Sequence, residues 1–68
     1  MHRFVAAKVR EIARRRRMSL NRLADFASMS RSHLGRLLDC EQSPTLATLT
    51  RIAAALDVPT RELLPPTG

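Results

Sequence analysis

The chain has 68 residues, which is enough for one small domain with a single hydrophobic core and too short for two domains. Hydrophobic residues make up 44% of the chain but aromatic residues only 3%, so the core must be built from aliphatic side chains. No apolar run approaches the roughly 20 residues that span a bilayer, and no stretch resembles a secretion signal. The single cysteine, Cys40, excludes an internal disulfide, and we expect a cytoplasmic protein without membrane contact.

The basic residues gather in the first half of the chain. Residues 1–36 contain ten Arg and Lys against two Asp and Glu, a net charge of +8, whereas residues 37–68 carry a net charge of −2. A basic half of this kind suits a polyanion, and nucleic acid is the commonest polyanionic partner of a small basic domain. Charge alone does not decide between a protein with such a partner and a basic protein that has none.

The first predicted element is a helix over residues 4–17, because Val5, Val9 and Ile12 recur on one helical face. Arg14 to Arg17 close this helix, where cations complement the negative end of the helix dipole. Contact between some of these arginines and phosphate groups is an equally open interpretation.

Two short helices are predicted next, over residues 19–27 and 31–38. Ser19 and Ser30 are good N-caps for them, because a hydroxyl oxygen can accept a hydrogen bond from an unpaired backbone N–H. One face of the second of these helices carries Leu34, Leu37 and Leu38. A connection of about three residues is typical of a helix-turn-helix, whose second helix can enter a major groove.

The C-terminal part is predicted to hold a fourth helix and a last short turn. Pro44 stops the third helix from continuing, and Thr45 is the predicted N-cap of the fourth. The apolar stripe of the fourth helix consists of Leu46, Leu49, Ile52, Ala53 and Leu56. Thr60 is predicted to cap the last turn. Nothing alternates with period two, so we predict an all-α fold, with one domain over residues 1–64 and a frayed tail over residues 65–68.

Arginine and serine side chains lie on the polar face of the helix predicted over residues 31–38. At about 100° per residue, Ser32 and Arg36 point away from the leucines. Arg31 lies at the exposed N-terminal end and His33 on a flank. The planar fork of an arginine can donate two hydrogen bonds to a guanine. A merely solvated face is the commoner role of such arginines, but the helix pair and the charge asymmetry favour DNA.

The stretch MSLNRLADFASMSRSHLGRLL, followed by SPTLATLTRIAAALDVPTRELL, resembles the Cro/C1-type, or Xre-like, helix-turn-helix family in order and spacing. The resemblance covers about residues 9–64. Matching positions are Ser19, Leu23, Ala24, Ser30, Leu34, Pro44, Leu49, Ile52, Ala53 and Leu56. It implies a compact five-helix, lambda-repressor-like domain that binds operator DNA, commonly as a symmetric dimer.

The resemblance and the residue pattern together predict a site and its partners. We expect a transcription regulator that binds double-stranded DNA at a pseudo-palindromic operator as a homodimer, with residues 31–38 in the major groove and no cofactor or metal. The expected base readers are Arg31, Ser32 and Arg36. The expected backbone contacts are Arg14, Arg17, Ser19, Arg22, Ser30, His33 and Ser43. The expected dimer surface is Val58, Leu63 and Leu64, for which closure of the monomer core is the alternative.

The chain departs from the family pattern at four places. Ser28 stands where the family usually has a glycine, and a residue with a Cβ is strained at positive φ. Leu20 replaces a glutamine that often touches a phosphate, and residues 39–42 are acidic and polar where a glycine and basic residues are common. Ala13 and Leu38 replace both members of a partly buried ion pair, so we predict that these two side chains contact each other.

The sequence also bears on other classes of function. His2, His33 and Cys40 form no catalytic or metal-binding spacing, so no enzyme is expected. A protein-interaction module, antitoxin-like or partner-recruiting, stays open because the acidic loop of residues 39–41 suits a protein better than DNA. RNA binding is a weaker choice, because both aromatic residues, Phe4 and Phe26, are predicted at the core or its edge.

Overall fold

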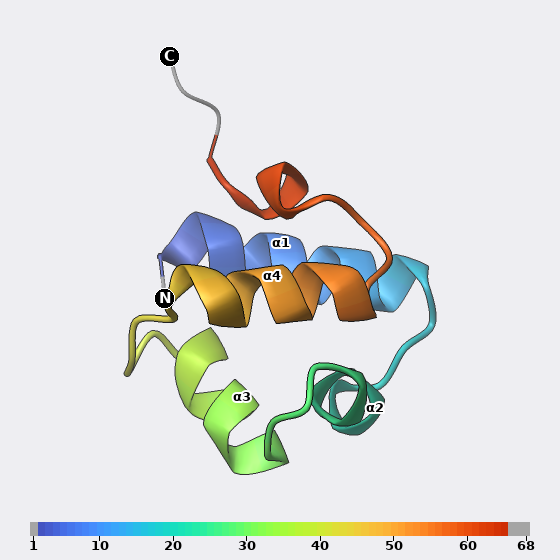
Figure 1. The fold of residues 1–68 in the computed structure, drawn as a ribbon, viewed down its shortest axis with the longest axis horizontal. Coiled ribbons are helices and arrows are strands. Elements are labelled where there is room, and N and C mark those ends of the chain that lie inside the picture. The colour runs from blue at the N-terminus through green and yellow to red at the C-terminus, as the bar shows by residue number, and fades with distance from the viewer. Residues whose placement is uncertain (1, 66–68) are drawn as a thin grey trace.

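The computed structural model describes residues 2–65, and these form four α-helices and one 3-10 turn (Figure 1). The elements are α1 (Arg3–Arg15), α2 (Leu20–Phe26), α3 (Arg31–Leu38), α4 (Leu46–Ala55) and η1 (Thr60–Leu63). The prediction of an all-α fold is confirmed for these residues, which contain no strand. The five-helix count is not confirmed, because the fifth segment is a 3-10 turn of four residues. Of the predicted tail, residues 66–68 lie outside the described part.

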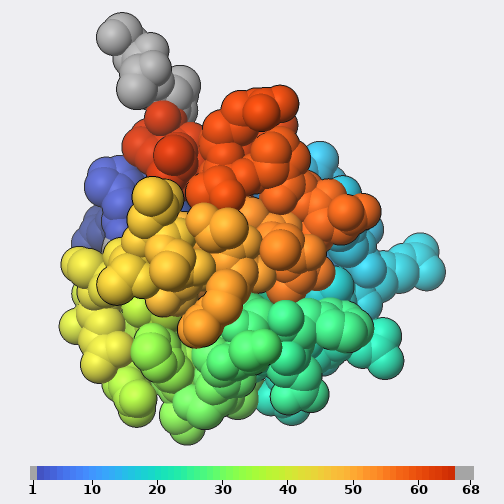
Figure 2. Space-filling view, viewed as in Figure 1, coloured from blue at the N-terminus to red at the C-terminus, as the bar shows by residue number. Residues whose placement is uncertain are grey.

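The short helix pair and the C-terminal turn lie on opposite sides of the molecule. In Figure 1, α2 and α3 lie at the bottom, α1 and α4 in the middle, and η1 at the top. Helix α2 contacts α3 and α4, α3 contacts α1, and η1 contacts both α1 and α4. On the face shown in Figure 2, side chains close the space between α4 and the helix pair. The helix pair therefore packs against α1 and α4 on one side, and its other side carries exposed residues.

The core is aliphatic, as the composition predicts. Its largest fully buried side chains are Val9, Ile12, Leu23, Leu34, Leu37, Ile52, Leu56 and Leu63. They come from every helix and from η1, and each contributes about 1.5–3 kcal/mol by leaving water. Among the residues described here, no helix has the length and apolar character needed to cross a membrane.

Hydroxyl side chains begin three of the helices. The oxygens of Ser19, Ser30 and Thr45 accept hydrogen bonds from the backbone N–H three residues on, at 3.1, 3.0 and 3.1 Å. These three predicted N-caps are confirmed. The predicted cap at Thr60 is wrong, because Thr60 is itself the first residue of η1 and the cap position belongs to Pro59, whose side chain makes no cap bond.

Each α-helix among residues 2–65 ends in the same way. The residue after the C-cap has a positive φ, at Arg17 (54°), Ser28 (58°), Cys40 (63°) and Asp57 (59°). The next N–H then donates to a carbonyl five residues back, as in Met18 to Ala13, Met29 to Ala24, Glu41 to Arg36 and Val58 to Ala53. In each case the N–H of the residue at positive φ also donates to a carbonyl three residues back. The two bonds together define a Schellman motif, in which glycine is the usual residue at positive φ. No glycine occupies any of these four places.

One helix end and two side chains differ from the prediction. Helix α1 ends at Arg15 and not at Arg17, because Arg17 already has a positive φ. Phe26 is 61% exposed, since it lies about 100° around α2 from the core residue Ala27. Leu46 is 70% exposed, because the side chain of a first helical residue points beyond the helix N-terminus.

Ala13 and Leu38 are both buried members of one core, on helices that contact each other. Replacement of an ion pair by two apolar residues fits this burial, because neither residue leaves a charge without a partner. Their direct side-chain contact stays a prediction.

Candidate nucleic-acid interface

Helix α3 is divided into a buried side and an exposed side. Leu34, Leu37 and Leu38 are buried in the core. Arg31, Ser32 and Arg36 are exposed. The division follows from the helical period, because residues three and four apart share a face while the residues between them face outward. Three candidate base readers therefore project from one short helix whose opposite side is fixed by the core.

Arg31 lies along α3, over a residue that has no side chain. A Cβ placed on Gly35 would be 2.9 Å from Nη1 of Arg31. The guanidinium therefore lies beside the middle of the helix, one turn from its own Cα. Sequence reasoning missed Gly35, although its spacing of four residues from Arg31 was a signal that could have found it.

The candidate backbone contacts are distributed over several elements. Arg22 on α2 and Ser43 in the loop before α4 are exposed, and His33 on α3 is half-buried. Ser19 and Ser30 use their hydroxyl oxygens as acceptors in the helix caps, which leaves each O–H free to donate to a phosphate. The possible donors thus lie at the beginnings of both short helices and in the loop that follows them.

One surface hollow brings two of the candidate residues together. The hollow has a volume of about 420 Å³ and lies between the C-terminal half of α1 and the beginning of α2. Its lining residues are Arg10, Ala13, Arg14, Met18, Ser19 and Leu20. Arg14 and Ser19 were predicted as backbone contacts and Arg10 was not. Arg10 lies four residues before Arg14 on α1, so helical spacing could have indicated it.

The four consecutive arginines have different surroundings. Arg14 lines the hollow, and Arg15 is exposed in the last turn of α1. Nη2 of Arg16 donates a hydrogen bond to the backbone oxygen of Asp57 at 3.4 Å, which links α1 to the end of α4. Arg17 is exposed and occupies the left-handed position after the helix. The run is therefore partly structural, and Arg14 is the member that faces a candidate site.

The titratable residues considered for catalysis do not converge. His2 is the N-cap of α1, and its Nδ1 accepts a hydrogen bond from the N–H of Phe4 at 3.1 Å. Cys40 is an exposed free thiol just after α3, and His33 lies within α3. Within residues 2–65, no group of three or more His, Cys, Asp or Glu side chains could hold a metal ion.

The three candidate dimer residues differ in accessibility. Leu63 has 0% of its surface exposed, so it belongs to the monomer core and cannot form an interface. Val58 is half-buried and packs against the same core. Leu64 is 42% exposed. The alternative of core closure therefore holds for Leu63, and Leu64 offers the largest apolar surface of the three.

A pair of short helices joined by a tight turn, with an arginine-bearing second helix seated by its leucines on a small helical core, defines the helix-turn-helix class of DNA-binding fold. Residues 5–65 match the helix-turn-helix domain family, and the chain belongs to this family. The resemblance to the Cro/C1-type branch is confirmed by the matches described next.

Two known proteins resemble the chain closely. The HTH-type transcriptional regulator SutR of Escherichia coli (strain K12) is 38% identical over 64 residues, which are 94% of this chain and 36% of SutR. The chain thus spans about a third of the length of that relative. The crystal structure of the restriction-modification controller protein C.AhdI from Aeromonas hydrophila superimposes with a TM-score of 0.86 at 26% identity, covering 91% of this chain and 94% of that one.

Proposed function

We propose that the chain is the DNA-binding domain of a sequence-specific transcription regulator, with α3 in the major groove of its operator. The observation that carries this proposal is the division of α3, whose leucines are buried while Arg31, Ser32 and Arg36 are exposed. An α-helix fits the major groove, where arginine can recognise guanine by two hydrogen bonds. The names of the two relatives, a transcriptional regulator and a controller protein, support the same proposal.

The proposed roles divide between base reading and attachment to the backbone. Arg31, Ser32 and Arg36 read base edges. The backbone contacts are Arg14, Arg17, Ser19, Arg22, Ser30, His33 and Ser43. Backbone contacts fix the position of the domain on the duplex, whereas base contacts carry the sequence preference. The two groups should therefore respond differently to substitution.

The proposed active form is a homodimer on a pseudo-palindromic operator. The domain measures 33 × 24 × 19 Å, while successive half-sites on one face of DNA are about 34–36 Å apart. One copy can therefore place α3 in one half-site, and a second copy is needed for the other. The half-exposed Leu64, with Val58 beside the core, is the apolar surface proposed for contact between the copies.

Selection of bound duplexes from a random DNA pool, followed by sequencing, tests the proposal. We expect enrichment of a pseudo-palindrome with half-sites one helical turn apart for the wild type. The variant Arg36→Ala should lose preference at one base pair in each half-site. A pool that stays random with the wild type would contradict sequence-specific binding.

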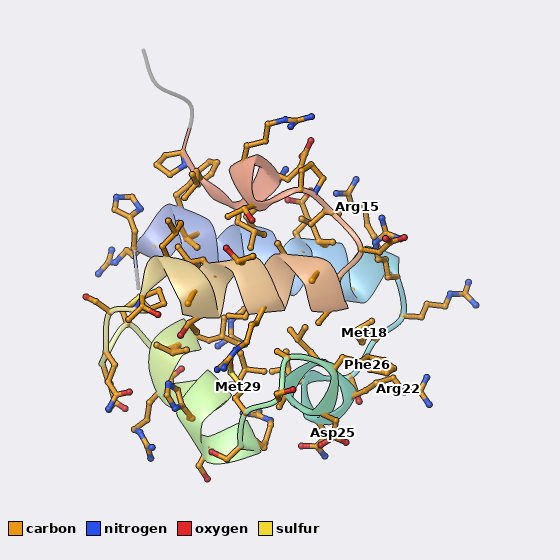
Figure 3. All side chains as sticks on the ribbon, in the orientation of Figure 1. Arg15, Met18, Arg22, Asp25, Phe26 and Met29 are labelled. Carbon is orange, nitrogen blue, oxygen red and sulfur yellow. The ribbon has the colours of Figure 1, made fainter. Side chains whose placement is uncertain are left out.

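Binding to a protein partner is a second candidate function, favoured by one observation on α2. Phe26 is 61% exposed, and Figure 3 shows it projecting from α2 near Arg22. A large exposed aromatic residue is a common anchor in protein interfaces. Salt dependence separates the two functions, because DNA binding through phosphates weakens steeply as salt rises and an apolar protein contact does not.

A further inference from the structure

The hollow between α1 and α2 has the chemistry of a seat for a backbone phosphate. Two arginines, Arg10 and Arg14, line it from successive turns of α1, and Ser19 lines it from the beginning of α2. Its other lining residues are the apolar Ala13, Met18 and Leu20, and none is acidic. Guanidinium and hydroxyl groups donate hydrogen bonds to phosphate oxygens, while apolar lining residues can contact a deoxyribose.

The two arginines of the hollow differ in their partners. Nη2 of Arg10 lies 3.5 Å from Oδ1 of Asp39, a residue 29 positions away at the end of α3. Arg14 forms no ion pair within the described part of the chain. The side chains of Arg10 and Asp39 are 49% and 65% exposed, so water and salt screen their attraction. A phosphate that enters the hollow therefore meets Arg14, which has no ion-pair partner among the described residues. It also meets Arg10, which is weakly paired with Asp39.

From this arrangement we propose that Arg10 and Arg14 bind a DNA phosphate in the hollow, and that Asp39 competes with the phosphate for Arg10 and so lowers DNA affinity. The inference rests on the proposed DNA binding and adds Arg10 and Asp39 to it. Because Asp39 is the C-cap of α3, the same exchange of partners frees this carboxylate beside the reading helix. Asp39 thus limits affinity through a named partner and not only through its negative charge.

The test is a double-mutant cycle on Arg10 and Asp39, measured by fluorescence anisotropy with a labelled duplex of random sequence at several salt concentrations. We expect Arg10→Gln to weaken binding about tenfold at low salt and to reduce the slope of log K against log salt by about 1. Asp39→Asn should tighten binding severalfold. In the Arg10→Gln background, Asp39→Asn should change affinity less than about twofold, because the guanidinium for which Asp39 competes is then absent.

Two matched variants control for net charge. Arg15→Gln removes a neighbouring arginine that does not line the hollow, and Glu41→Gln removes an acid two residues from Asp39. We expect Arg15→Gln to change log K less than half as much as Arg10→Gln does. Glu41→Gln should likewise change log K less than half as much as Asp39→Asn. All the substituted side chains are exposed, and unchanged circular dichroism and thermal unfolding verify that each variant folds.

The outcomes separate this inference from the function on which it rests. Equal tightening by Asp39→Asn with and without Arg10 would show simple repulsion and overturn the competition. Identical affinities of Arg10→Gln and Arg15→Gln would overturn the phosphate seat while leaving DNA binding intact. A wild-type protein that binds no duplex at any salt concentration would overturn both the seat and the proposed function.

Discussion

The guanidinium of Arg31 occupies the space over Gly35 that a Cβ would enter, with Nη1 2.9 Å from that position. Gly35 has no positive φ, so its backbone does not require glycine. Glycine inside a helix is less stable than alanine by about 0.5–1 kcal/mol. Gly35 therefore costs α3 some stability and leaves room along the exposed face of the helix for the Arg31 side chain.

Gly35→Ala separates stability from DNA reading. The added methyl group raises helix propensity, so the free energy of unfolding should increase by about 0.5–1 kcal/mol in urea denaturation. The same methyl group moves the far end of the Arg31 side chain, so if Arg31 reads a base pair from this position, discrimination there should fall by up to about 1 kcal/mol in duplex selection. Gly35→Ala should add little to the effect of Arg31→Ala on sequence preference. Increased stability with an unchanged preference would contradict this role of Gly35.

Arg36 and Arg14 should respond differently when each is replaced by alanine. Arg36→Ala should weaken binding to the selected operator by about 1–3 kcal/mol and relax the preference at one position, because a base contact is lost. Arg14→Ala should weaken binding to operator and random duplexes alike and lower the salt slope by about 1. Anisotropy titrations with both duplexes measure the difference. An equal loss on every duplex from Arg36→Ala would make Arg36 a backbone contact.

Adjacent leucines near the end of the described chain provide a matched pair for stability and association. Leu63→Ala removes a fully buried side chain and should lower the free energy of unfolding by about 2–5 kcal/mol. Leu64→Ala removes a half-exposed side chain and should cost the monomer less than about 1 kcal/mol. If Leu64 contacts a second copy, analytical ultracentrifugation should show weaker dimerisation of Leu64→Ala. Unchanged association would remove Leu64 from the proposed interface.

Ser28→Gly should stabilise the protein. Ser28 has a φ of 58° in the turn between α2 and α3, a conformation that is about 1–2 kcal/mol less favourable for a residue with a Cβ. Part of this gain is offset because glycine adds conformational entropy to the unfolded chain, so we expect a net increase of about 0.5–1 kcal/mol in urea denaturation. Ser32→Gly is the control and should destabilise by up to about 1 kcal/mol, since Ser32 lies within α3. A destabilised Ser28→Gly variant would contradict the argument.

The features that sequence could predict are those set by neighbours along the chain. The caps at Ser19, Ser30 and Thr45 and the buried stripe of α3 depend on residues three or four apart, and all of them are as expected. The exposure of Phe26 and Leu46 follows from their places beside the core face of α2 and at the first position of α4, which an apolar side chain alone does not reveal.

One feature of the candidate phosphate seat could not be predicted, although the helical spacing of Arg10 from Arg14 could have indicated Arg10 itself. The pair of Arg10 and Asp39 joins residues 29 positions apart, and their meeting requires the packing of α1 against α3. The hollow is lined by the end of α1, the turn after it and the beginning of α2, and sequence spacing does not indicate that these residues enclose a space. In contrast, Arg14 and Ser19 each carried a local signal and were both found there.

The glycine-free ends of the helices bear on how the domain can come apart. Local preferences alone do not favour the end of α2 and the turn at Ser28. The left-handed conformation is unfavourable for serine, and a helix of seven residues is marginal in water. What holds the turn is the attachment of the following Met29 to the assembled core. The exposed face of α3 and the core should therefore be lost together in one cooperative transition. A fragment of residues 19–38 moved to another protein would not keep the arrangement of α2 and α3.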